Sequence, residues 1–308
     1  MANSFTSTMF WWILRWNAVE TESNSMERIA RYLEIDQERK PIKEGVPPAY
    51  WPSSGDLRVE DLSAKYSADG PTVLHSLSFD AKAGERLGIV GRTGSGKSTL
   101  TLSLLQCIPT EGEVFYDNIP ISTLNLDALR SKITIIPQSP DLVGGTLRQN
   151  LDPFGEHDDQ TLNSALLSAG LQSIQQNLRS DDRINLDTVV VSGGSNFSVG
   201  QRQIIALARA IVRRSKLLIL DEATSAIDHE TDSIIQSSLR NELGSDVTVI
   251  IVAHRLQTVM DVDRLMVLEA GRMVEFDTPR NLLQKPAGYF RDLVDNSHDR
   301  TALLSAMG

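Results

Sequence analysis

The sequence has very little cysteine: among 308 residues there is one, Cys107. A single cysteine cannot form a disulfide within the chain, which fits a reducing setting such as the cytosol. An excess of basic residues is also lacking, because 30 Lys and Arg stand against 40 Asp and Glu, for a net charge of −10. This balance argues against a broad basic face that binds nucleic acid, and we expect no nucleic-acid partner.

Internal repeats, low-complexity tracts and long hydrophobic runs are lacking too. The apolar run at residues 9–14 (MFWWIL) is too short to span a bilayer by itself. It has no basic region before it and no small-residue cleavage site after it, which argues against a signal peptide. Trp11, Trp12, Trp16 and Arg15 are residue types found at membrane interfaces. Composition alone leaves three interpretations open: the end of a truncated transmembrane helix, a surface amphipathic segment, or a buried core helix.

The chain is longer than one hydrophobic core usually serves, so we expect a large domain with an appendage, or two subdomains. A helical pattern covers residues 4–33 and ends before a Pro-rich stretch at 41–52. Proline stops both helix and sheet, so this stretch is interpreted as a linker, and the compact domain is expected to begin near Ser54.

Two kinds of strand follow the linker. Apolar alternation at 57–60 and around 73–79 predicts half-buried antiparallel strands. Continuously apolar runs separated by helical stretches then predict strands that are buried on both faces of a mainly parallel α/β sheet. There are four such runs, at 87–90, 133–136, 217–220 and 247–252.

Each of these four runs is followed by polar or glycine-rich residues. The loop from Gly91, then Gln138, then Asp221 with Glu222, and then His254 come directly after the strands or within a few residues of them. Ligands of parallel sheets bind outside the carboxyl ends of the strands. Four strands therefore deliver their side chains to one edge, and the arrangement predicts a single site.

The strongest single motif is a phosphate-binding loop, G-x-x-x-x-G-K-S, between the first apolar run and a helical stretch. Its glycines let backbone N–H groups curl around phosphate oxygens, and the helix N-terminus adds positive potential. Lys97 is expected to pair with the β- and γ-phosphates and Ser98 to hold Mg²⁺. The predicted nucleotide-binding residues here are Gly91, Arg92, Thr93, Gly94, Ser95, Gly96, Lys97, Ser98 and Thr99.

Two acids end the third run, in the segment LLILDE at 217–222. Adjacent residues of an extended chain point in opposite directions, so one carboxylate can face Mg²⁺ while the next faces a water molecule. We assign Asp221 to the outer shell of the metal and Glu222 to the water as general base. His254, which ends the fourth run, is predicted to contact the γ-phosphate and to orient the water.

A capped helix is predicted from Ser198, which has capping-box spacing to Gln201. Apolar residues then recur at helical spacing and give one buried stripe. The pattern by itself indicates only a well-capped amphipathic helix.

The motifs in this order resemble the cassette of ABC ATPases over residues 57–294. The resemblance implies a P-loop NTPase (RecA-like) core with a mainly parallel sheet, an antiparallel β subdomain and an α-helical subdomain at about 138–215. The expected organisation is an N-terminal helix (1–40), a linker (41–54), the ATP-binding cassette (55–295) and a C-terminal tail (296–308). The motifs that carry the resemblance are the phosphate loop, Gln138, the signature Ser198-Val199-Gly200-Gln201, the segment LDEA, the segment Ser225-Ala226-Ile227-Asp228, and His254.

Details of these motifs are similar to the second cassette of the ABCC (multidrug-resistance-associated) subfamily. The segment ESNSMERIARYL at 22–33 also resembles the helix that leaves the last membrane span of that family, which favours a transmembrane-helix remnant for residues 1–40. The likeness implies that Tyr66 stacks on adenine and that Gln138 senses Mg²⁺ and the γ-phosphate. It further implies that Ser198, Gly200 and Gln201 contact ATP held by a second cassette in a head-to-tail dimer, with Asp228 among the nucleotide-site residues.

Two positions depart from the common pattern. Val199 stands where most ABC families have glycine, and a β-branched residue limits close approach of backbone to phosphate. We therefore expect the site that uses this signature to be the weaker of the pair. Ser192 stands where related exporters usually have glutamate in the segment that touches the coupling helices of the membrane domain.

The leading interpretation is the ATP-hydrolysing motor of a transporter that exports organic anions or conjugates. Its cofactors would be ATP and Mg²⁺, its partners a second cassette and a transmembrane domain upstream in the full-length polypeptide. It would be membrane-associated, with the cassette on the cytoplasmic face. One alternative is a soluble, non-transport ABC ATPase; another is a non-hydrolysing fragment from a truncated transporter gene.

Overall fold

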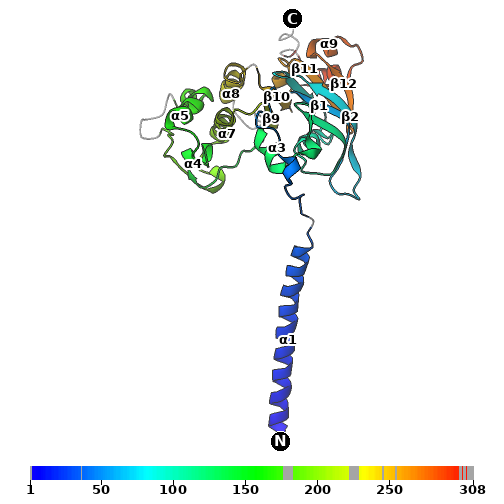
Figure 1. Cartoon of the computed structure of the whole chain (residues 1–308), viewed down its shortest axis with the longest axis vertical. Helices are drawn as coiled ribbons and strands as arrows, with labels where there is room; N and C mark the ends of the chain where they lie inside the picture. The colour runs from blue at the N-terminus through cyan, green and yellow to red at the C-terminus, as the bar shows by residue number, and fades with distance from the viewer. Residues whose placement is uncertain are drawn as a thin grey trace. The chain divides into compact units, whose positions relative to one another are not determined.

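In the computed structural model the chain divides into two compact units, Met1–Lys40 and Pro41–Gly308. The structure describes residues 2–35, 37–175, 183–221, 229–244, 246–253, 255–297, 300 and 303. Each unit is described by itself (Figure 1).

The first unit is one long helix, α1 (Ala2–Leu33), as the sequence pattern predicts. Its described side chains from Phe5 onward are exposed along the whole helix, including Trp11, Trp12 and Trp16 at 64%, 72% and 72%. No helix in the described part of the chain has both the length and the apolar character that crossing a membrane requires.

The second unit is built on two main sheets, as the α/β prediction required. An antiparallel sheet has the order β2-β1-β4-β5, and a six-stranded sheet has the order β12-β11-β3-β10-β9-β6. Within the larger sheet β11, β3, β10, β9 and β6 are mutually parallel, and only β12 is antiparallel to its neighbour. The strands of these sheets are β1 (Leu57–Lys65), β2 (Thr72–Ala81), β3 (Arg86–Val90), β4 (Thr110–Tyr116), β5 (Ile119–Pro120), β6 (Ile133–Ile136), β9 (Leu217–Asp221), β10 (Thr248–Val252), β11 (Arg264–Glu269) and β12 (Arg272–Asp277).

The remaining elements are helices and one small ribbon. A two-stranded sheet pairs β7 (Gly145–Thr146) with β8 (Val189–Val190). The helices of this unit are α2 (Lys97–Leu104), α3 (Leu126–Lys132), α4 (Leu147–Leu151), α5 (Asp159–Ser168), α6 (Leu171–Ile174), α7 (Val199–Arg213), α8 (His229–Asn241), α9 (Pro279–Gln284) and α10 (Tyr289–Asp295), with 3₁₀ turns η1 (Lys43–Gly45), η2 (Ile121–Thr123), η4 (Ser192–Gly194) and η5 (Leu256–Val259).

Three hydrophobic clusters stabilise this unit. The first lies between the antiparallel sheet and the central sheet and includes Leu57, Leu100 and Ile250. The second lies between the central sheet and the helices α4 to α8, which gather on one side in Figure 1, and it includes Ile204 and Leu220. The third packs α9 and α10 against β11. Strands such as β9 are therefore buried on both faces, which explains their continuous apolar runs.

The stretch 41–54, interpreted from the sequence as a linker, belongs to the second unit. Trp51 is 3% exposed, and its ring lies edge-on to Tyr116 with centroids 5.0 Å apart. The Trp51 Nε1–H also donates to the Tyr116 carbonyl at 2.9 Å. The Asp117 carboxylate accepts backbone N–H bonds from residues 53–56. The stretch is thus packed on the domain through the buried indole of Trp51 and through its backbone N–H bonds to the Asp117 carboxylate.

Candidate functional site

The carboxyl ends of four parallel strands meet at one edge of the central sheet. Val252 pairs with Ile89 of β3 on one side and with Asp221 of β9 on the other, and Leu220 pairs with Ile136 of β6. Neighbouring strands lie roughly 5 Å apart. The segments that follow β3, β10, β9 and β6 therefore leave the sheet side by side, which is the convergence that the sequence predicted.

The loop between β3 and α2 has a backbone conformation that depends on glycine. Gly94 and Gly96 have φ of 81° and 104°, in the left-handed region. A Cβ on Gly91 would lie 2.3 Å from the Leu268 carbonyl oxygen, so only glycine fits there. The loop turns so tightly that Ser95 N–H donates to the Arg92 carbonyl at 3.0 Å. Such a loop presents successive N–H groups at a helix N-terminus, which is an arrangement that binds anions.

Two polar groups inside this loop are buried. Lys97 is 5% exposed, and its ammonium donates to the carbonyls of Gly91 at 2.8 Å and Arg92 at 3.3 Å. Ser95 is 3% exposed, and its Oγ has no hydrogen-bond partner among the described residues. A buried hydroxyl without a partner costs free energy that a ligand oxygen can recover. The loop therefore offers a cation and an unused donor to a group rich in anionic oxygens.

Ser98 and Thr99, in the first turn of α2, differ in exposure. Ser98 is exposed at the mouth of the loop, whereas Thr99 is 3% exposed. The Tyr66 hydroxyl lies 3.1 Å from Thr99 Oγ1, and the Tyr66 residue is 58% exposed. Tyr66 thus stands beside the loop with much of its surface open. Arg92 and Thr93, in the loop itself, are also exposed.

Asp221 and Gln138 end neighbouring strands at this edge. Asp221 is the last residue of β9 and is half-buried, and Gln138 follows β6 and is exposed. Oxygen ligands of this kind suit Mg²⁺, which usually keeps several waters or ligand oxygens as well. Among the described residues no group of three or more His, Cys, Asp or Glu side chains could hold a metal on its own. A metal here would consequently need Ser98, Asp221 or Gln138 together with oxygens of the bound ligand.

Gln203 of α7 is a structural determinant of this edge that the sequence interpretation did not include. It is 1% exposed, and its Nε2–H₂ group donates to the carbonyls of Pro137 at 3.0 Å and Gln138 at 2.7 Å. The signal was present in the sequence, because Gln203 is a polar residue next to the apolar stripe of a helix. Its bonds fix the segment that carries Gln138 against α7.

The signature segment lies at the start of α7. Ser198 is the N-cap, with both bonds of the predicted capping box: Gln201 N–H donates to Ser198 Oγ at 3.1 Å, and Ser198 N–H donates to Gln201 Oε1 at 2.8 Å. Ser198 is exposed, whereas Gly200 is buried. The helix belongs to the second hydrophobic cluster, while α2 with the loop belongs to the first. The signature and the loop of one chain are thus carried by different parts of the unit.

Three of the predicted site residues, Glu222, Asp228 and His254, lie outside the described residues. Their neighbours in sequence are described: Asp221 at the end of β9, and Ala253, which follows β10 and is 5% exposed.

Comparison with known proteins gives consistent matches. The family model described as "ABC transporter" matches residues 74–225. The "ATP-binding cassette transporter abc4" of Schizosaccharomyces pombe is 44% identical over 95% of this chain, which covers 20% of that protein. The "ATP-binding cassette sub-family C member 2" of Mus musculus is 41% identical over 94% of this chain and is covered to 18%. The chain spans about one fifth of the length of the curated relatives it matches.

The fold has a counterpart among solved structures. A bacterial Atm1-family ABC exporter with ATP bound matches 89% of this chain with a TM-score of 0.77 and 27% identity, and 47% of that exporter chain is covered.

Proposed function

This chain belongs to the ABC transporter family, with relatives of the C subfamily, and on that premise we propose that its second unit hydrolyses ATP with Mg²⁺ to drive export across a membrane. The observation that carries the proposal is the loop after β3. Its glycine-dependent turn, its buried Lys97 ammonium and its Ser95 hydroxyl, which has no partner in the described part of the chain, fit a polyphosphate. Mg²⁺, when bound, would neutralise phosphate charge and polarise the bond that breaks.

The proposed roles of the protein residues in ATP binding and hydrolysis are as follows. Lys97 and the loop N–H groups bind and orient the phosphates, and Tyr66 stacks on the base. Ser98, Asp221 and Gln138 hold the metal. Glu222, which follows Asp221 directly in the sequence, is the base that takes a proton from the attacking water. His254 orients that water.

We infer that the working unit is a head-to-tail pair of cassettes. The exposed Ser198 at the start of α7 and its neighbours Gly200 and Gln201 would contact the nucleotide held by the other cassette, and Asp228 would complete that site. This chain contributes its signature, with Val199, to one of the two nucleotide sites of the pair. Val199 makes that site the weaker of the two. The pair would act on a transmembrane domain in a longer polypeptide, with this cassette, the second one, on the cytoplasmic face.

Residues 1–40 are then the continuation of the last membrane-spanning helix of that polypeptide. The exposed tryptophans of α1 support this interpretation, because tryptophan is common at membrane interfaces. The cargo class is proposed to be organic anions and conjugates, on family likeness alone.

The test of hydrolysis is Glu222→Gln in the 308-residue chain, measured at protein concentrations high enough for pairing. We expect ATP binding to be retained and turnover to fall by at least a hundredfold, since the general base is lost. The matched control is Glu269→Gln, because Glu269 ends β11 at the same edge of the same sheet. Equal turnover of Glu222→Gln and wild type would contradict the base assignment, and a wild-type chain without ATP affinity would contradict the function.

A further inference from the structure

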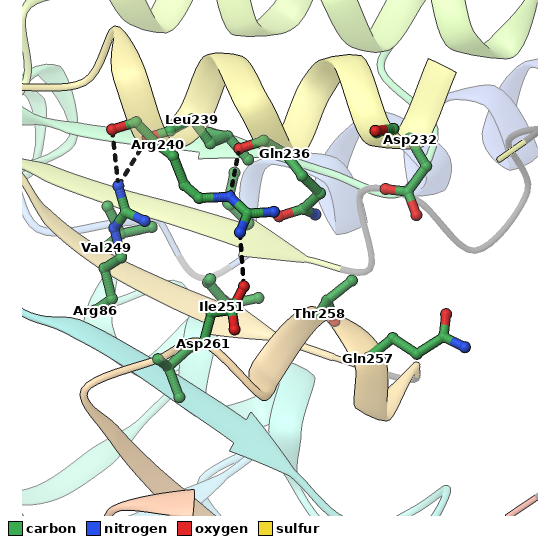
Figure 2. A pocket seen from close by; sticks show the side chains of 13 residues that line it. Arg86, Asp232, Gln236, Leu239, Arg240, Val249, Ile251, Gln257, Thr258 and Asp261 are labelled. Atoms are coloured by element: carbon green, nitrogen blue, oxygen red, sulfur yellow. Dashed lines mark hydrogen bonds and ion pairs between the residues drawn. The ribbon is translucent and has the colours of Figure 1, made fainter. Parts of the chain in front are cut away.

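A cavity of about 200 Å³ lies between α8 and the turn η5, on the central sheet (Figure 2). Its floor consists of apolar side chains from β9 and β10, Leu220, Val249 and Ile251. The helix α8 follows the segment that begins with Glu222, and η5 begins two residues after His254. The cavity thus separates the two elements that continue from the candidate catalytic residues.

Two ion pairs join α8 to the segment after β10, one near each end of the helix. Near its start, Asp232 Oδ2 lies 3.9 Å from Arg255 Nη1. Near its end, Arg240 Nη1 lies 2.6 Å from Asp261 Oδ2. The acid at the start and the base at the end both suit the helix dipole. Figure 2 shows Asp232 at one end of the cavity and the Arg240–Asp261 pair toward the other.

The end of α8 has further anchors. Arg86 of β3 donates to the carbonyls of Leu239 at 3.1 Å and Arg240 at 3.4 Å, and Arg240 Nε–H donates to the Gln236 carbonyl at 3.3 Å. The Arg240–Asp261 pair is therefore one of several bonds there. It is also exposed, with 50% and 65% of the two side chains accessible, so it contributes little alone.

The pair near the start of α8 is more buried, and its carboxylate is only partly satisfied among the described residues. The side chains of Asp232 and Arg255 are 15% and 34% exposed, and Asp232 Oδ1 is buried with no hydrogen-bond partner among the described residues. A partly satisfied buried carboxylate is a poor device for stability. Stability alone gives no reason for this pair, so the segments that it joins are more informative.

The sheet topology shows which segments the Asp232–Arg255 pair joins. β9 and β10 are neighbours, and Asp221 pairs with Val252. The chain leaves both strands at this level, and the two branches meet again where Asp232 contacts Arg255. Arg255 is also the N-cap residue of η5, and its carbonyl accepts a 2.7 Å bond from the Thr258 hydroxyl. The ion pair therefore closes a ring that contains Glu222 on one branch and His254 on the other.

We propose that Asp232 and Arg255 are positioning residues, which hold the branch carrying Glu222 and the branch carrying His254 in a fixed relation for hydrolysis. The inference rests on the proposed function. The cavity of about 200 Å³ beside the pair, lined by described residues of α8 and η5, gives this part of α8 room to shift when the pair is broken.

The test compares the two ion pairs of α8 in the 308-residue chain. Asp232→Asn, Arg255→Gln and their combination are measured beside Arg240→Gln, Asp261→Asn and their combination. We expect each change in the first pair to lower kcat about tenfold with KM and ATP affinity within twofold, and the double variant to be no slower than the single variants, since both remove one interaction. Asp232→Glu should recover at least half of the activity.

The control pair should leave kcat within twofold, whatever its effect on Tm. Equal kcat losses in the two pairs, or kcat losses that follow Tm, would mean that Asp232 and Arg255 are merely structural. A loss confined to ATP affinity, or additive losses in the double variant, would equally overturn the inference.

Hydrogen exchange separates this inference from the proposed function. Asp232→Asn should raise the exchange rate of the backbone amides of residues 257–260 at least fivefold without nucleotide, and Arg240→Gln should raise it less. If the wild-type chain fails to hydrolyse ATP, the proposed function falls, and the exchange rates still decide whether the pair joins the two branches. Unchanged exchange in Asp232→Asn would overturn the positioning role whatever the turnover.

Discussion

The two edges of the central sheet differ in how completely their charged and polar groups are satisfied. At the amino edge, Arg264 at the start of β11 donates to Asp80 at 3.0 Å and to both carboxylate oxygens of Glu85, and its guanidinium lies 4.7 Å from the centroid of the Phe276 ring. At the carboxyl edge, the Lys97 ammonium rests on two loop carbonyls, and Ser95 Oγ has no partner among the described residues.

The pKa shifts at the amino edge follow from this network. Hydrogen bonding to Arg264 is the main reason that the pKa of Asp80 lies below its ordinary value. For Glu85 burial acts to raise the pKa, but the bonds from Arg264 and from the Lys82 N–H outweigh it, so the pKa is lowered. Hydrogen bonding to Glu85 in turn raises the pKa of Arg264. One edge therefore stabilises the fold, while the other keeps binding capacity for a ligand, and mutations can separate the two roles.

The largest expected effect is at the carboxyl edge. Lys97→Ala should weaken ATP binding about a hundredfold, because it removes a charged donor to phosphate worth about 3 kcal/mol. The free energy of unfolding should change less than ATP affinity, since the two described bonds of the ammonium, at 2.8 and 3.3 Å, go to carbonyls of the adjoining loop. Equilibrium titration with a fluorescent ATP analogue measures the affinity. Lys65→Ala, on the neighbouring β1, is the control and should stay within twofold.

Arg264→Gln should show the reverse pattern at the amino edge. It leaves Glu85, whose side chain is 9% exposed, without its charged partner. We expect unfolding to become easier by about 2 kcal/mol, somewhat less than for a fully buried pair, while ATP affinity stays within twofold. Chemical denaturation followed by circular dichroism measures the first quantity. A loss of ATP affinity as large as that of Lys97→Ala would remove the distinction between the edges.

Ser95→Ala should change stability and binding in opposite directions. Deleting a buried hydroxyl that lacks a partner should stabilise the nucleotide-free chain by about 1 kcal/mol and weaken ATP binding by several-fold. Ser103→Ala, in the helix α2 that follows the loop, is the control, because Ser103 is also buried but its Oγ–H donates to the Thr99 carbonyl at 2.7 Å. That control should not stabilise the chain and should leave ATP affinity unchanged. A destabilised Ser95→Ala would show that its hydroxyl is already satisfied.

The smallest effect is a pH dependence of the amino edge. Folded-state pKa values below the ordinary 3.8 of Asp80 and 4.5 of Glu85 give stability that is present above those values and is lost as pH falls below them. The stability difference between wild type and Arg264→Gln should therefore be constant near neutral pH and shrink below pH 4.5. Denaturation curves across this range measure it. A difference that grows on acidification would contradict the sign.

Local features of the fold were predicted well because they depend on residues close in sequence. The capping box of Ser198 and Gln201 needs only neighbours three positions apart, and both of its bonds are present. The four continuously apolar runs are strands of the central sheet, β3, β6, β9 and β10. Their common edge also followed, because parallel strands deliver their carboxyl ends to the same side.

Contacts between residues far apart in the chain could not be predicted from the sequence. Trp51 looked like part of a proline-rich linker, yet its indole packs on Tyr116, a residue far away in the chain. Gln203 stands out in the sequence as a polar residue next to the apolar stripe of a helix, but its partners, the carbonyls after β6, are known only from the structure. The roles assigned to Glu222, Asp228 and His254 remain predictions, since these residues lie outside the described part of the chain.

The sequence by itself determined the chemistry that is available: a glycine-dependent turn before a lysine, acids at a strand end, a capped helix. Each depends on backbone conformations and hydrogen bonds within a few residues. Only the tertiary structure decided which groups become neighbours. It puts β10 between β3 and β9, brings Asp232 to Arg255, and leaves Ser95 Oγ buried with no hydrogen-bond partner among the described residues. Apolar runs of similar composition do not specify strand order, because that order depends on packing between segments distant in the chain.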